Sequence, residues 1–257
     1  ALKTAGYDGL HVTGRAEAPV VIEIGPEGAG VRDAAGLWGR TTSAAQESLD
    51  LAGADGAVVI GPAGENGVLY ANAASGHRFV GRGGIGAVMS SKNLKGIVAR
   101  GGAYRIRAAD PEKLTRVKKK GTAQINSNPV TSVQFRRYGT ASNVDICNRE
   151  GLLPVNNFRY RSDPRAEAVS GRAMAERYST KPSTCKPCSI LCRHKGSLPD
   201  ETEHQVPEYE SVGLLGPNLG IYDPDSLVAM NDLCNELGMD TVSAGGTLSW
   251  AMEEGER

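Results

Sequence analysis

The chain has 257 residues, which is enough for one or two domains with a substantial core. Its 29 basic and 29 acidic residues balance, so no global field is expected to favour nucleic acid or an anionic membrane surface. It has no apolar run of about 18 residues and no signal-peptide pattern, so we expect no membrane-spanning segment and a cytoplasmic location.

The first hundred residues predict short strands joined by turns. β-branched runs bounded by glycine and proline predict strands at residues 10–14, 19–25, 57–60 and 96–100. One helix is expected between them, from Thr41 or Thr42 to Leu51. Glycine is frequent, at 33 residues, and aromatic residues make up only 5%, which predicts many tight turns and close approaches of the backbone.

The remainder predicts helices. Asp110 followed by Pro111 is a helix start, and further helices are expected at residues 141–149, 223–237 and about 242–252. The fold class is therefore predicted as α+β, with a β-rich domain at residues 1–104 and a mostly helical domain at residues 105–257.

Three of the five cysteines lie within eight residues, at Cys185, Cys188 and Cys192. This spacing favours three ligands of an iron–sulfur cluster, one short of the four that a cubane needs. Zinc bound by the same thiolates and His194 is the alternative. Cys234 could in principle supply a fourth ligand, but it lies on the apolar face of a predicted helix, so core packing is the favoured interpretation. Cys147 also falls in a helical pattern and is expected to pack in the core.

A glycine-rich run at residues 81–95 is the second candidate site. Arg82, Gly83, Gly84 and Gly86 precede or begin a short helix, and uncovered amides beside a guanidinium suit a phosphate group. The run lacks the ending of a Walker A loop and the context of a dinucleotide fingerprint. A purely structural turn is the alternative interpretation.

Acidic residues after the cysteines are candidates for acid–base chemistry. Glu208 and Glu210 precede a glycine-rich turn, where desolvation of one carboxylate would suit it to proton transfer. Solvated surface acids are the alternative, and His204 is expected to be a lone surface histidine. Asp240 and Thr241 are expected to cap the last helix.

Taken together, these segments resemble the tungsten-dependent aldehyde:ferredoxin oxidoreductase family. The segments that carry the resemblance lie in order across nearly the whole chain: residues 6–8 (Gly-Tyr-Asp), 37–39 (Leu-Trp-Gly), 61–66 (Gly-Pro-Ala-Gly-Glu-Asn), 81–95, 139–141 (Gly-Thr-Ala), 153–158 (Leu-Pro-Val-Asn-Asn-Phe), the cysteine triplet, 207–210 (Pro-Glu-Tyr-Glu) and 233–241.

The resemblance implies a tungstopterin cofactor, in which tungsten or molybdenum is held by two pterins, beside a [4Fe-4S] cluster. It places Arg82, Gly83, Gly84 and Gly86 at a pterin phosphate and Asp240 with Thr241 in a pterin-contacting loop. It assigns Cys185, Cys188 and Cys192 to the cluster, and Glu210, with Glu208 as the second choice, to the position near the metal. The β-rich part would form the base for the pterins.

The activity that the resemblance implies is oxidation of an aldehyde to a carboxylic acid, with electrons passing through the cluster to ferredoxin or another iron–sulfur subunit. A tungsten-bearing aryl-CoA (benzoyl-CoA) reductase subunit and a non-catalytic zinc-stapled binding module are the alternatives. A homo-oligomer is compatible with each. The absent initiator Met and the missing fourth cluster cysteine predict a partial chain that binds neither cofactor completely and is inactive alone.

Overall fold

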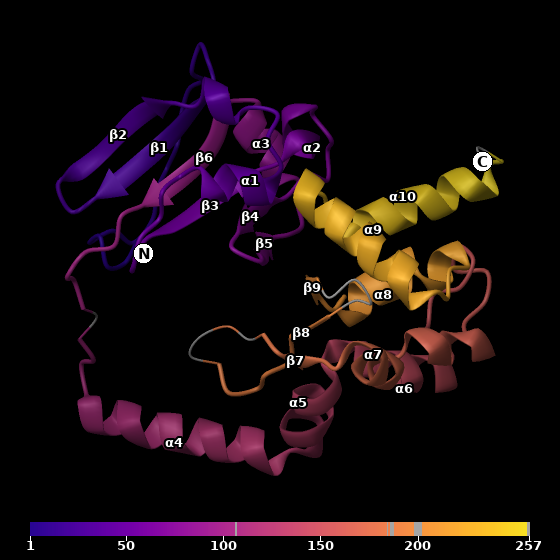
Figure 1. Cartoon of the computed structure of the whole chain (residues 1–257). Coiled ribbons are helices and arrows are strands. Elements are labelled where there is room, and N and C mark those ends of the chain that lie inside the picture. Colours follow the sequence, from indigo (N-terminus) through magenta and orange to yellow (C-terminus); the bar gives the residue numbers. More distant parts are fainter. Residues whose placement is uncertain (106, 184, 186–187, 198–201, 256–257) are drawn as a thin grey trace. The chain divides into compact units, whose positions relative to one another are not determined.

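The computed structural model describes residues 1–105, 107–183, 185, 188–197 and 202–255. The chain forms two compact units (Figure 1). Unit 1 contains Ala1–Arg107 and Leu233–Asp240, and unit 2 contains Ala108–Asp232 and Thr241–Arg257. Within the described part of the chain, no helix has the length and apolar character needed to cross a membrane.

A six-stranded sheet forms the centre of unit 1. Its strands are β1 (Val20–Gly25), β2 (Gly28–Asp33), β3 (Gly56–Ile60), β4 (Ala73–Ser75), β5 (Arg78–Val80) and β6 (Leu94–Ala99), in the order β2-β1-β6-β3-β4-β5. Strands β1 and β6 are parallel, and every other neighbouring pair is antiparallel. The sheet is therefore mixed.

Alternating side chains of the sheet supply two apolar clusters. Val21, Val59 and Val98 belong to one cluster, whereas the neighbouring Val58 and Ile97 pack against the other. This alternation follows from the period of two in a β-strand. Three short helices lie in the same unit: α1 (Thr42–Glu47), α2 (Pro62–Glu65) and α3 (Ile85–Ser90).

The strands expected at residues 19–25, 57–60 and 96–100 are confirmed as β1, β3 and β6. The prediction of a strand at residues 10–14 is wrong. That segment has no regular structure, and Val12 packs against the sheet instead of pairing with it. Helix α1 begins as expected, with Thr41 accepting a hydrogen bond from the Ala44 amide, but it ends at Glu47. Asp50 then has a left-handed backbone, with φ of 47°, which is incompatible with a continuing helix.

A buried ion pair ties three segments of unit 1 together. Lys95 of β6 is fully buried, and its Nζ lies 2.5 Å from Oε1 of Glu65 in α2. Lys95 also donates to the Arg40 carbonyl at 2.9 Å, and the Gly39 amide donates to Glu65 Oε2 at 2.6 Å. Burial lowers the pKa of Lys95, and the Glu65 carboxylate opposes that shift. Both charges are thus satisfied by polar partners in the protein.

Unit 2 is mostly helical. Its helices are α4 (Pro111–Ser127), α5 (Phe135–Tyr138), α6 (Asn143–Arg149), α7 (Gly171–Tyr178), α8 (Tyr209–Leu215) and α10 (Thr241–Glu253). Helix α9 (Pro224–Leu237) belongs to unit 2 through Asp232 and to unit 1 from Leu233 onward. The expected start of α4 is confirmed, because Asp110 accepts from the Lys113 amide at 2.8 Å.

A small antiparallel sheet accompanies these helices, with strands β7 (Lys181–Pro182), β8 (His194–Ser197) and β9 (Glu203–Gln205). Glu203 forms ion pairs with Lys181 at 2.8 Å and Lys195 at 2.5 Å. These lysines lower the pKa of Glu203 to about 2. The α+β prediction is confirmed by the β-rich first part and the helical second part.

Candidate functional site

Backbone contacts fix the position of Asp240 in unit 1. A side chain at Gly61 would meet the Leu237 carbonyl at 2.4 Å, so only glycine allows the end of α9 to approach this closely. The Asn72 amide donates to the Gly238 carbonyl at 2.8 Å, and the Asp240 amide donates to the Tyr70 carbonyl at 3.2 Å. These bonds place Asp240 against the loop that precedes β4.

Arg82 lies beside Asp240, although 158 positions separate them in the sequence. The guanidinium Nε is 3.8 Å from a carboxylate oxygen of Asp240. The Arg82 side chain is 66% exposed, whereas that of Asp240 is only 9% exposed. The structure therefore brings together two of the residues expected to bind the cofactor, as an accessible cation next to a nearly buried carboxylate.

The glycines beside Arg82 have two different roles. A side chain at Gly84 would meet the Leu69 carbonyl at 2.2 Å, and one at Gly86 would meet the Asn72 carbonyl at 2.5 Å. Both glycines therefore allow α3 to pack directly on residues 69–72. A side chain at Gly81 or Gly83 would meet nothing within 4 Å, so open space for a ligand lies only beside these two.

The three clustered cysteines lie in the loop between β7 and β8 of unit 2. All are free thiols; Cys185 and Cys188 are exposed and Cys192 is half-buried. The Cys188 amide donates to the Cys185 carbonyl at 2.7 Å. Three thiols without a disulfide are the donor set that an iron–sulfur cluster uses.

These thiols do not converge on a common centre. Among the described residues, no three His, Cys, Asp or Glu side chains are close enough together to hold a metal ion. The three thiols thus fit an iron–sulfur cluster as a donor set. Their positions would have to change for all three to bind one cluster. Such ordering is common where metal binding supplies folding energy.

The other residues considered as ligands are engaged elsewhere. Both ring nitrogens of buried His194 have partners: Nε2 is 3.1 Å from the Phe135 carbonyl, and Nδ1 is 3.3 Å from the Thr180 hydroxyl. Cys234 is buried as expected, and burial raises its pKa to about 11. Neither residue is therefore positioned as a fourth ligand.

Helix α8 carries the candidate acids. Glu210 is exposed in its first turn, and Glu208 precedes it with Oε1 at 3.9 Å from Nε of Arg193. The Tyr209 amide donates to the Thr140 hydroxyl at 3.1 Å, and the Ser211 and Thr241 hydroxyls are 2.8 Å apart. These contacts fix α8 and connect it to the first residue of α10.

Two further expectations need correction. His204 is not a lone surface residue: its Nδ1 is 2.5 Å from a carboxylate oxygen of Asp232, and both side chains are about 30% exposed. Cys147 is half-buried in α6 and not part of the core. Burial, together with the neighbouring Cys147 thiol, raises the pKa of Tyr209.

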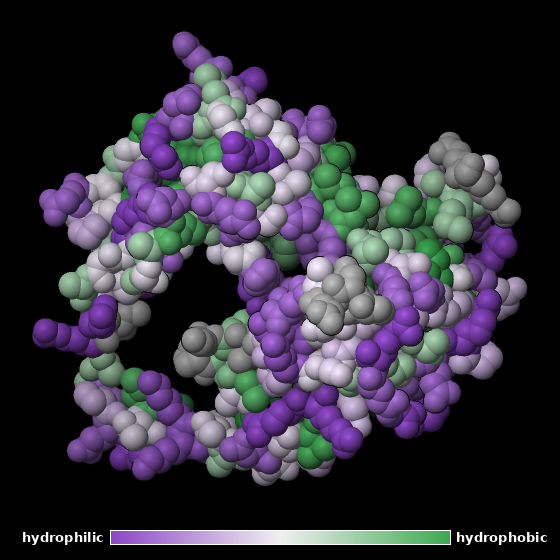
Figure 2. Space-filling model, in the orientation of Figure 1, coloured by the Kyte–Doolittle hydropathy of each residue, from purple (hydrophilic) through white to green (hydrophobic). Residues whose placement is uncertain are grey.

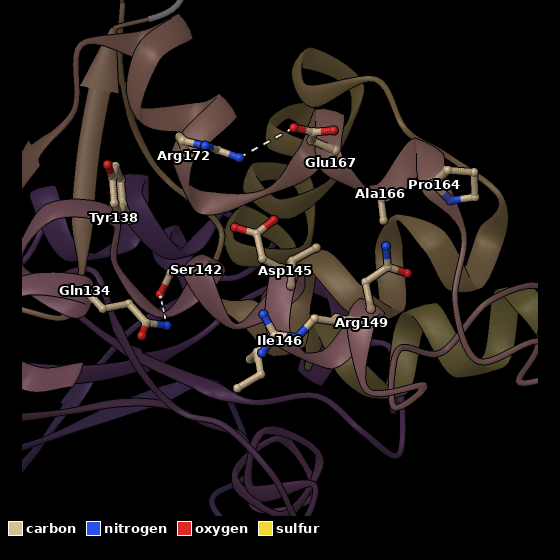
Figure 3. Close-up of a pocket in the computed structure, with 12 residues that line it drawn as sticks. Gln134, Tyr138, Ser142, Asp145, Ile146, Arg149, Pro164, Ala166, Glu167 and Arg172 are labelled. Atoms are coloured by element: carbon tan, nitrogen blue, oxygen red, sulfur yellow. Dashed lines mark hydrogen bonds and ion pairs between the residues drawn. The ribbon is translucent and has the colours of Figure 1, made fainter. Parts of the chain in front are cut away.

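A pocket in unit 2, lined by both apolar and charged residues, was not predicted from the sequence. It has a volume of about 690 Å³, and helices α6 and α7 contribute to its wall. Figure 3 shows the Asp145 carboxylate between the Arg172–Glu167 pair, at 3.5 Å, and Arg149. Partial burial raises the pKa of Asp145. None of the predicted site residues lines this pocket.

A strained loop was also missed. Asn156, Asn157 and Phe158 all have left-handed backbones, with φ between 47° and 61°. Asn218 and Ser249 hold the loop: the Phe158 amide donates to Asn218 Oδ1 at 3.2 Å, and the Ser249 hydroxyl donates to Asn157 Oδ1 at 3.0 Å. The adjacent asparagines are the sequence signal, since asparagine tolerates this conformation best after glycine.

Comparison with known proteins gives matches along the whole chain. The family described as "Aldehyde ferredoxin oxidoreductase, N-terminal domain" matches residues 1–101, and "Aldehyde ferredoxin oxidoreductase, domains 2 & 3" matches residues 116–257. The tungsten-containing aldehyde ferredoxin oxidoreductases of Pyrococcus furiosus and Pyrococcus horikoshii are each 44% identical, over 98% and 100% of this chain.

More distant relatives share the fold. An aliphatic sulfonate oxidoreductase subunit of Pyrococcus furiosus is 30% identical over 98% of this chain. The solved active site complex of benzoyl coenzyme A reductase has a TM-score of 0.80 and 24% identity, covering 99% of this chain and 41% of that one. The chain spans about 42% of the length of the curated relatives it matches.

Proposed function

The chain belongs to the aldehyde ferredoxin oxidoreductase family, and we propose that it contributes to an enzyme that oxidises an aldehyde to a carboxylic acid and reduces ferredoxin. In the balanced reaction, aldehyde and water give carboxylic acid, two protons and two electrons. Two one-electron carriers accept the electrons. We assign residues 1–104 to the pterin base and residues 105–257 to part of the helical region, in a cytoplasmic enzyme.

The observation that carries this proposal is the contact between Arg82 and Asp240. The exposed guanidinium supplies a cation for a pterin phosphate, and a side chain added at Gly81 or Gly83 would meet open space, which leaves room for that group. The Asp240 carboxylate supplies an acceptor for ring N–H groups. A tungsten or molybdenum ion bound by two pterins supplies Lewis acidity and accepts an electron pair.

The remaining residues have separate roles. Cys185, Cys188 and Cys192 supply three thiolates to a [4Fe-4S] cluster. Glu210 acts as a general base or hydrogen-bond partner to the reacting group, and Glu208 is the second candidate. Support for Glu210 comes from its exposed position in the first turn of α8, where a substrate can reach the carboxylate.

A dye-linked assay of the full-length, metal-loaded protein tests the proposal. Aldehyde-dependent reduction of a viologen is expected, whereas reduction of benzoyl-CoA by a low-potential donor would indicate the aryl-CoA reductase alternative. Glu210→Gln should lower turnover about 10²- to 10⁴-fold, the usual contribution of a general base. Glu208→Gln tests the second candidate in the same assay, and Glu176→Gln, which removes an exposed carboxylate in α7, is the matched control. Unchanged turnover in Glu210→Gln with intact metal content would remove that role from Glu210.

A further inference from the structure

Positive charge is concentrated in one part of this otherwise neutral chain. Residues 113–144 contain seven lysines and arginines and no aspartate or glutamate, whereas the whole chain has 29 residues of each sign. Five of the seven lie in α4: Lys113, Arg116, Lys118, Lys119 and Lys120. Such a local field attracts an anionic partner even though the net charge is zero.

Three of these cations form one stripe on α4. Lys113, Arg116 and Lys120 are spaced three and four residues apart, which places them on the same face of the helix. All three are exposed, and α4 contains no buried residue. No ion pair joins them to an acid in the described ranges of the chain. Figure 2 shows mainly hydrophilic colours over α4, and Figure 1 shows it extending away from α5.

Arg136 connects this helix to the cysteine loop within unit 2. The Arg136 Nη2 donates to the Ser189 carbonyl at 3.1 Å and to Asn126 Oδ1 at 3.3 Å. Ser189 directly follows Cys188, and Asn126 lies in the last turn of α4. The C-terminal end of the basic helix is therefore hydrogen-bonded through the Arg136 side chain to the loop that carries the clustered cysteines.

We propose that the basic stripe of α4 is the docking surface for an acidic one-electron carrier protein of the ferredoxin class. This inference rests on the proposed function and adds the surface at which the electron acceptor binds. Each docked carrier takes one electron and becomes reduced, so two carriers dock for each aldehyde oxidised. Complementary charge accelerates such encounters more than it tightens them, which suits a carrier that must leave after each transfer.

The test uses the full-length, metal-loaded protein and an acidic ferredoxin. Reversing all three charges, with Lys113→Glu, Arg116→Glu and Lys120→Glu together, should lower the association rate about 10-fold or more at low salt. The difference should shrink as salt is added. Lys120→Glu alone should show a smaller loss than the triple variant, and Lys118→Glu, which reverses one charge on another face of α4, should bind as the wild type does.

Aldehyde oxidation with a viologen separates the two proposals. The triple variant should retain dye-linked turnover and metal content while its KM for ferredoxin rises, because the small dye needs no docking surface. Equal ferredoxin binding by the triple variant and the wild type would overturn the docking surface. The same conclusion would follow if the triple variant lost binding to anionic vesicles or duplex DNA but kept its binding to ferredoxin. Absence of dye-linked aldehyde oxidation in the wild type instead overturns the proposed function.

Discussion

The Arg82–Asp240 region of unit 1 and the cysteine loop of unit 2 are organised in different ways. Around Arg82 and Asp240, glycines without side chains allow backbone segments to touch, and buried polar partners hold them. In the cysteine loop, two exposed thiols follow a two-residue strand. The first site is formed by contacts within the protein, whereas the described thiols of the second do not converge on a common centre.

This difference fits the groups that we propose for the two sites. A large organic cofactor binds best to a surface that is already ordered, because the cost of ordering the protein would reduce the free energy of binding. Thiolates bind iron strongly enough to order a loop as they bind. Substitutions in unit 1 should therefore change folding stability, and changes in the cysteine loop should change metal content first.

The largest stability effect is expected at Lys95. Lys95→Met leaves the Glu65 carboxylate buried without its cation, and the free energy of unfolding should fall by about 3–5 kcal/mol. Urea unfolding measures this loss. Lys92→Met is the matched control, because the Lys92 ammonium donates to the Gly14 carbonyl and forms no ion pair with any acid that the structure describes. Adding Glu65→Leu to Lys95→Met should restore part of the loss; an equal loss in Lys92→Met would contradict the assignment.

The second largest effect is expected in the alkylation rates of cysteines from the two regions. In metal-free protein, exposed Cys185 and Cys188 should react with iodoacetamide at least about 100-fold faster than Cys234, which is buried and has a pKa of about 11. Mass spectrometry of the alkylated peptides measures each rate. Metal loading should protect Cys185 and Cys188. Equal rates at Cys188 and Cys234 would show that the described packing of Cys234 is wrong.

The glycines of the 81–86 segment give a smaller effect. Gly86→Ala forces a methyl group against the Asn72 carbonyl, so stability should fall by about 1–3 kcal/mol. Gly81→Ala should change stability by no more than about 0.5 kcal/mol, because open space surrounds that position. Thermal unfolding compares the two. A result in which both variants lose stability equally would argue against close packing as the role of Gly86.

The smallest effect is expected at Glu203 and depends on pH. Its pKa falls from 4.5 to about 2 on folding, so its stabilising contribution is complete above pH 4.5 and is lost as the pH falls toward 2. Glu203→Gln should therefore unfold at lower urea than the wild type at pH 6, and the two should converge in acid. Glu176→Gln, an exposed acid without an ion pair in the described structure, should match the wild type throughout.

Local signals in the sequence predicted much of the fold. Strand β1 is a run of β-branched residues, and Asp110 with Pro111 marks the start of α4 by side-chain capping. Strand β2 was not predicted because Gly28 and Gly30 have low strand propensity. Its pairing with β1 stabilises the strand despite that low propensity. The strand predicted at residues 10–14 does not form, because this segment has a suitable composition but pairs with no neighbouring strand.

The candidate site was less accessible to local reasoning. The proximity of Arg82 and Asp240 depends on the approach of Gly61 to Leu237, a contact between distant segments that no short pattern encodes. Gly84 and Gly86 suggested a ligand cradle, but their absent side chains make room for the backbone of residues 69–72. The cysteine spacing indicated its donor chemistry directly, because all three ligands lie in one loop.

The central claim is that the cysteine loop holds an iron–sulfur cluster in a tungsten enzyme. Anaerobic elemental analysis of the full-length protein tests it most directly. We expect tungsten together with about four iron and four acid-labile sulfide per chain, and loss of iron in Cys188→Ser. Stoichiometric zinc without iron or tungsten would contradict it and favour a zinc-stapled module.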